Sequence, residues 1–142
     1  MKLFALILFF VGSLCSHAAD FDARAAFGVS PGHDLDVAMK RAVRDKKPVF
    51  LAFWDSKKKG NAGLEMIYDF GLEETKKLLK ENFILVLLDR EHKSVQEYMP
   101  AGNTEGAQYV IISPDGKLLK SGAFYGNSGV GLKGMKEFLN LP

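Results

Sequence analysis

The stretch KPVFLAFWDSKKKG, from Lys47 to Gly60, decides the fold of this chain. Its first half, Val49 to Trp54, is an unbroken apolar run, half of it aromatic, that follows Pro48. A run this short and this apolar predicts a strand buried on both faces rather than a helix. Polar residues and lysines follow at once, and a helical pattern then begins. In α/β proteins, chemistry is usually found where a central strand passes into its helix, so this junction is the first candidate for a site.

The length and charge of the chain set the class of protein. With 142 residues, 47% of them hydrophobic, the chain can build one domain around a core of its own. Lysine and arginine together number 19 and aspartate and glutamate 17, which leaves a net charge of +2. So small an excess gives no case for a nucleic-acid partner.

Residues 1–19 have the pattern of a cleavable signal peptide. Lys2 comes first, an apolar core runs from Leu3 to Leu14, and small residues lead to a cleavage site before Ala19. The apolar core is too short for an ordinary membrane span. We therefore expect a periplasmic or secreted protein, with no stable membrane span once the leader is removed.

The sequence has one cysteine, Cys15, and it lies inside this predicted leader. A lipoprotein signal is not favoured, because Leu14 rather than a small residue precedes Cys15 and Gly12 stands where a lipobox has leucine. After cleavage, the chain would have no thiol to form a disulfide, act as a nucleophile or bind a metal.

The elements that follow alternate between helix and strand. Residues 20–33 predict an irregular lead-in, and residues 34–142 predict one domain. Its expected elements are a helix over 34–46, a strand over 48–54, a helix interrupted at Gly71, a strand over 83–89, a short helix over 92–99, strands over 109–112 and 117–124, and a closing helix. Two strands joined by a helix are parallel. The turn at residues 113–116 makes the last two strands a hairpin.

This order resembles the thioredoxin fold. The resemblance rests on KPVFLAFW, on the interrupted helix followed by ENFILVLLD, and on the hairpin YVIISPDGKLLKSG. These stretches are most similar to secreted thioredoxin-like proteins, and the resemblance covers the chain from about Asp34 to its end. It implies an α/β protein, a three-layer α/β/α sandwich with a mixed four-stranded central sheet and an extra N-terminal helix.

Both functional motifs of that family are missing here. The family has a Cys-x-x-Cys where the helix starts after the first strand, whereas the matching region, Asp55 to Asn61, has no cysteine. The family's cis-proline position is held by Ala107, preceded by Gly106. A cis bond before a residue other than proline costs about 2.5–4 kcal/mol, so we expect a trans bond there. No catalytic residue of the family can be transferred to this chain.

The residues left on the face of the lost motif are the candidate binding site, which we call the Trp54 face: Trp54, Asp55, Ser56, Lys57, Lys58, Lys59, Gly106, Ala107 and Gln108. Its three lysines could bind an anion at the helix start, although a solvated loop is the favoured interpretation. Trp54 is equally compatible with contacting a peptide and with packing in the core. Asp55 and Glu65 could form an acid/base pair, but their spacing fixes no distance between the carboxylates.

Metal and phosphate chemistry have little support. His33 and His92 are the only histidines after the leader, and they lie in different segments with no ligand spacing. The glycine-rich stretch at 126–133 lacks the ending of a P-loop. We therefore expect no metal and no cofactor.

Two classes of function stay open. The favoured one is a redox-inactive module that binds a protein or peptide through the Trp54 face. The alternative is an enzyme, either an accessory in thiol–disulfide metabolism or a non-thiol activity at Asp55 to Gly60. Ser56 has no histidine nearby in sequence to act as its base. The sequence identifies neither the partner nor the oligomeric state.

One further expectation concerns the helix after the lysines. Leu64, Ile67 and Tyr68 recur at helical spacing. They predict an inward apolar stripe on that helix.

Overall fold

The computed structural model describes residues 22–55, 57, 62–99, 107–126 and 129–142. The signal peptide expected over residues 1–19 lies outside these residues. In chain order the elements are α1 (Ala23–Phe27), α2 (Leu35–Asp45), β1 (Val49–Trp54), α3 (Ala62–Phe70), α4 (Glu73–Asn82), β2 (Ile84–Asp89), α5 (Lys93–Gln96), β3 (Gln108–Ile112), β4 (Leu118–Ala123) and α6 (Val130–Leu139).

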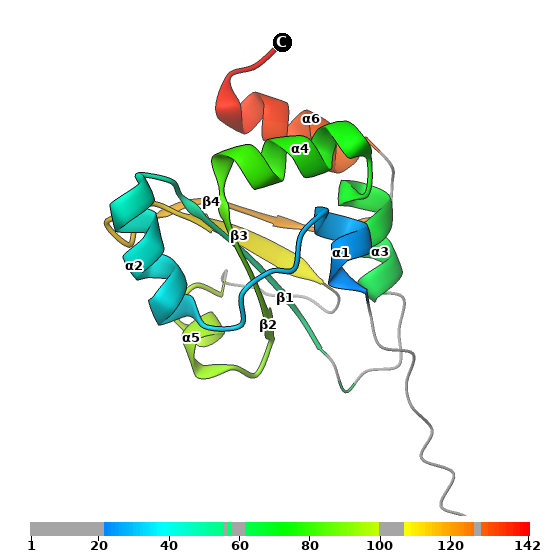
Figure 1. Cartoon of the computed structure of the whole chain (residues 1–142). Helices are drawn as coiled ribbons and strands as arrows, with labels where there is room; N and C mark the ends of the chain where they lie inside the picture. Colours follow the sequence, from blue (N-terminus) through cyan, green and yellow to red (C-terminus); the bar gives the residue numbers. More distant parts are fainter. Residues whose placement is uncertain (1–21, 56, 58–61, 100–106, 127–128) are drawn as a thin grey trace, which may run out of the picture.

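The strands form one mixed four-stranded sheet in the order β2-β1-β3-β4 (Figure 1). β1 and β2 are parallel, and their register runs from Val49 opposite Ile84 to Trp54 opposite Asp89. β3 is antiparallel to both β1 and β4. The predicted parallel pair, the hairpin and the mixed sheet are therefore confirmed.

Helices cover both faces of the sheet, which makes the predicted three layers. α2 and α5 pack on one face, where their apolar residues meet Leu51, Val86 and Val110. α1, α3, α4 and α6 pack on the other face, around Phe50 and Tyr109. Because side chains alternate along a strand, each central strand supplies both cores. This is why the β1 sequence is apolar throughout.

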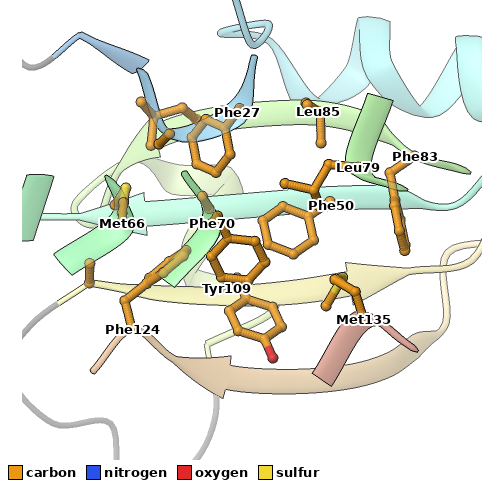
Figure 2. Close-up of a cluster of buried hydrophobic side chains, with 14 of the residues drawn as sticks. Phe27, Phe50, Met66, Phe70, Leu79, Phe83, Leu85, Tyr109, Phe124 and Met135 are labelled. Carbon is orange, nitrogen blue, oxygen red and sulfur yellow. The ribbon is translucent and has the colours of Figure 1, made fainter. Parts of the chain in front are cut away.

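Aromatic rings fill the core between the sheet and α1, α3, α4 and α6 (Figure 2). The ring of Phe50 stacks on Tyr109 at 4.9 Å and meets the edges of Phe27, Phe70 and Phe83. Edge-on and offset ring pairs add stability beyond the area that they bury. Phe50, on the strand that decides the fold, is thus the centre of this core.

The helix boundaries follow local signals. Asp34 caps α2, since its carboxylate accepts a hydrogen bond from Val37 N at 3.0 Å. α3 ends at Phe70, and Gly71 N still donates to Ile67 O at 2.7 Å. A Cβ on Gly71 would lie 2.2 Å from that same oxygen, so only glycine fits at this break.

The lead-in differs from the irregular segment predicted over residues 20–33. It contains α1, which begins at the Asp22 cap and ends at Gly28 with φ 73°. Phe27 is 1% exposed in the core, and Gly32 forms a parallel bridge with Val86 at the outer edge of β2. A five-residue helix is too short to show a period in sequence, which is why the pattern did not predict it.

The inward stripe predicted for α3 is wrong at two of its three residues. Leu64 and Tyr68 are 52% and 56% exposed, whereas Ile67 is half-buried against the core. Met66 and Phe70 are the fully buried residues of this helix. Asp69 is also buried, and its carboxylate accepts a hydrogen bond from Tyr125 N at 2.6 Å. This bond lets a polar residue occupy the inner face.

Among the described residues, no helix combines the length and the apolar character that crossing a membrane requires.

Candidate functional site

The site begins where β1 and β2 end side by side. Trp54 and Asp89 are partners in the parallel register, and Arg90 N donates to Trp54 O at 2.7 Å. The carboxyl ends of the two strands therefore lie at one edge of the sheet. This is the position at which α/β proteins commonly bind ligands.

Each strand passes into a turn held by its own aspartate. The carboxylate of Asp55 accepts a hydrogen bond from Lys57 N at 3.0 Å, and that of Asp89 accepts one from Glu91 N at 2.8 Å. Such contacts between a side chain and the backbone two residues on are typical of aspartate in turns. Asp55 thus has a structural role that explains its position after the strand.

An ion pair between Lys57 and Glu91 joins the two turns. The hydrogen bond from Lys57 to Glu91, aided by the charge of that carboxylate, raises the pKa of Lys57. Both side chains are exposed, so the pair contributes little to stability. A raised pKa keeps Lys57 charged at neutral pH, which makes it unsuitable as a general base.

A hollow of about 430 Å³ lies beside Trp54, and we call it the Trp54 pocket. One wall is formed by Trp54 and the end of β2, Leu87–Asp89. The other wall is formed by residues of the lead-in: Asp22, Ala23, Arg24, Ser30, Pro31 and His33. Trp54 itself is half-buried, with part of its ring against the core cluster around Phe50. The structure thus gives it both a core contact and a solvent-facing surface.

His33 fixes the lead-in against the sheet edge. Its Nδ1 lies 3.0 Å from Leu87 O. Because a carbonyl oxygen only accepts, Nδ1 must carry the proton of this bond, and Nε2 of the neutral ring is then an acceptor. His33 and Arg24 both line the pocket, so its wall includes an imidazole and a guanidinium.

The other half of the Trp54 face is buried where it is described. Gln108 pairs with Phe53 across the sheet and is 7% exposed, and Ala107 is 1% exposed. These two residues therefore offer almost no surface to a partner. Ser56, Lys58, Lys59 and Gly106 lie outside the described residues, so the expected trans bond before Ala107 stays a prediction.

Comparison with known proteins identifies the architecture. No protein-family model matches the chain, and no curated protein does either. Solved structures do match: a DsbH oxidoreductase has 20% identity and a TM-score of 0.63, over 85% of this chain and 91% of its own. This chain has a thioredoxin-like fold.

Two other structures support the same assignment. The C-terminal domain of DsbD from Neisseria meningitidis, in its oxidised form, is 17% identical, with a TM-score of 0.55 over 80% of this chain and all of that one. A thioredoxin from Thermus thermophilus is 15% identical, with a TM-score of 0.58 over 77% of this chain and 86% of its own. At these identities the similarity establishes the thioredoxin-like fold alone.

The remaining sequence candidates have structural roles in this thioredoxin-like domain. His92 caps α5 through a hydrogen bond from Ser94 N, and His33 binds Leu87 O. Over the described part of the chain, no three histidine, cysteine, aspartate or glutamate side chains gather as a metal site would require. Glu65 lies against Gly126, in the connector before α6.

The lead-in wall of the pocket was missed by sequence reasoning. Asp22, Arg24 and His33 are far from Trp54 in sequence, and the bridge at Gly32 brings them to it. The Pro31-Gly32 pair before α2 was the available signal, since it ends the lead-in at a turn rather than in a helix.

Proposed function

We propose that this thioredoxin-like chain is a non-enzymatic module that binds an extended protein segment in the Trp54 pocket. The observation that carries the proposal is the hollow beside a half-buried indole at the ends of β1 and β2. Its volume, about 430 Å³, is within the range of ligand sites. Tryptophan and arginine, both present here, are the residues that most often dominate binding between proteins.

The proposal includes the absence of redox activity. Thiol–disulfide exchange needs a thiolate that attacks a disulfide sulfur. The sequence has only Cys15, which belongs to the predicted leader, and a single cysteine cannot form the dithiol pair. The same leader supports a periplasmic or secreted location.

A second candidate function is favoured by the neighbours. Two of the matching structures are a DsbH oxidoreductase and a DsbD domain. A chain with this fold could hold the polypeptide substrate while another protein supplies the cysteines. This accessory role in thiol–disulfide metabolism uses the same pocket, so it differs from the first candidate in the partner alone.

A peptide selection tests the binding proposal. Residues 20–142 are immobilised, and a displayed library of random peptides is selected against them. We expect enriched peptides whose affinity falls at least about tenfold in Trp54→Ala and in Arg24→Glu. Arg24→Glu changes an exposed residue, so it separates lost binding from lost folding.

The matched control is Lys133→Glu, an exposed charge reversal on α6. Enriched peptides that bind both pocket variants as tightly as the unaltered chain would show that the pocket is not the binding site. A disulfide-reductase assay on residues 20–142 addresses the redox part. We expect no turnover above a blank without protein, and turnover would overturn the proposal.

A further inference from the structure

A second concave surface lies at the opposite end of β2 from the Trp54 pocket. Two hollows, of about 400 and 250 Å³, meet at Lys80, which lines both. The larger is formed by α4 and Gly28, and the smaller lies between α4, α2 and the start of β2 at Phe83 to Leu85. Figure 1 shows the segment from α1 to α2 passing below α4 and along β2, where Gly32 bridges to Val86.

The cations that line these hollows come from two helices. Lys76, Lys77 and Lys80 belong to α4, and Arg41 belongs to α2. We call this surface the α4 basic groove. The negative end of the α4 dipole favours Lys80 near its last turn. The dipole does not account for Arg41, which reaches the same hollow from another helix.

Most of these cations form no ion pair with another described residue. Lys76 Nζ lies 2.9 Å from Glu73 Oε1, and that pair is internal to α4. Within the described part of the chain, Arg41, Lys77 and Lys80 form no ion pair, and all three are exposed. Three cations without an ion pair, around two adjoining hollows, attract an anionic ligand.

The acidic residues of the groove disfavour a ligand with a high density of negative charge. Glu73 and Glu81 line the larger hollow together with the three lysines, so that hollow carries charges of both signs. A dense polyanion such as a polyphosphate would place charges against these carboxylates. A polypeptide that carries single carboxylates, spaced along an extended chain, can place them next to the cations and away from Glu73 and Glu81.

We propose that the α4 basic groove binds an extended acidic polypeptide segment. The groove adjoins the Trp54 pocket at Ser30, which lines both, but it reaches the other end of β2: the groove contacts Phe83–Leu85 and the pocket contacts Leu87–Asp89. The binding is electrostatic and weakens as salt is added.

Fluorescence anisotropy on residues 20–142 tests the proposal. The probe is a short labelled peptide of alternating glutamate and serine, at low ionic strength, with the glutamine–serine peptide as its neutral counterpart. We expect the acidic peptide to bind and the double variant Lys77→Glu/Lys80→Glu to weaken its binding about tenfold. Arg41→Glu, on the other helix, is expected to weaken it as well.

The control is Lys93→Glu/Lys117→Glu, which makes the same change in net charge at α5 and at the β3–β4 turn. Equal weakening by this control would overturn the proposal, because net charge alone would then explain binding. Equal binding of the neutral peptide, or no binding of the acidic peptide, would also overturn the proposal.

Other anions are tested in the same way. Tighter binding of inorganic triphosphate, or of vesicles of anionic phosphatidylglycerol, would overturn the proposal and assign the groove to that ligand. Trp54→Ala should leave this binding unchanged.

Discussion

At Gly131, the first turn of α6 comes so close to α3 that no side chain fits between them. A Cβ at this position would lie 2.2 Å from Asp69 O and 3.2 Å from the ring of Phe70. Since the first of these atoms is backbone, the helices themselves would have to separate. We expect Gly131→Ala to lower the free energy of unfolding by about 1–3 kcal/mol, measured by urea denaturation.

Gly134, one turn further along α6, is the matched control. A Cβ there has no neighbour closer than 3.9 Å. Alanine also stabilises a helix interior relative to glycine, by about 1 kcal/mol. Gly134→Ala should therefore leave the free energy of unfolding unchanged or raise it. Equal losses in the two variants would contradict the close approach of α6 and α3.

Tyr109 makes the stability of the protein fall at alkaline pH. Burial raises the pKa of the Tyr109 hydroxyl, and the charge of Asp69 adds to this effect. The folded state then holds the proton more tightly than the unfolded chain, whose tyrosine pKa is about 10. This contribution to stability is complete below that pH and is lost as pH rises through the raised folded pKa.

Tyr109→Phe should therefore make the alkaline loss of stability shallower. The measurement is the free energy of unfolding from urea denaturation at a series of pH values above neutrality. Tyr68→Phe, which removes a hydroxyl from a residue 56% exposed, is the control. An equal change of slope in both variants would mean that burial of Tyr109 is not the cause.

Among the elements, α1 offers a test of whether the lead-in belongs to the folded core. Phe27 is 1% exposed, and its ring meets that of Phe50 at 6.3 Å. Truncating a buried phenylalanine leaves a cavity, so we expect Phe27→Ala to lower the free energy of unfolding by about 3–5 kcal/mol. Urea denaturation of residues 20–142 measures it.

Val37→Ala is the control for this prediction, because Val37 is 53% exposed on α2. Its effect should stay within about 0.5 kcal/mol. If Phe27→Ala cost no more than this control, α1 would be a peripheral helix, and the wall that it gives the Trp54 pocket would be in doubt.

Strong local signals made most elements predictable. β1 and β2 are continuous apolar runs because both of their faces are buried, and the β3–β4 hairpin turns at Ser113 to Gly116, where Gly116 N donates to Ser113 O. The buried face of α3 was not predictable, since Leu64 and Tyr68 have the same helical spacing as Met66 and Phe70. Long-range packing decides between the two faces, and it includes the contact of Asp69 with Tyr125.

Half of the candidate site could be predicted in the same way. Trp54 follows directly from the end of the central strand. The opposite wall of the pocket depends on the pairing of Gly32 with Val86, a contact across 54 residues that no local pattern encodes. Gln108 pairs with Phe53 on β1, next to Trp54, but the sequence did not show that Ala107 and Gln108 are buried.

For the whole molecule, the lack of a thiol after residue 19 predicts that stability does not depend on redox conditions. The unfolding temperature of residues 20–142 should be the same with and without dithiothreitol, because no disulfide can form. A sample of the full sequence secreted from cells extends the test to the leader. A lower unfolding temperature in reductant would show that Cys15 is retained and forms a disulfide.

The central claim, that this thioredoxin-like domain works by binding in the Trp54 pocket, is tested most directly by nuclear magnetic resonance. A peptide from the selection is titrated into isotope-labelled residues 20–142, and the backbone and indole signals are followed. We predict that the largest shifts fall on Trp54, Arg24, His33 and Leu87–Asp89. Shifts confined to β4 and α6, with the Trp54 indole unmoved, would contradict the claim.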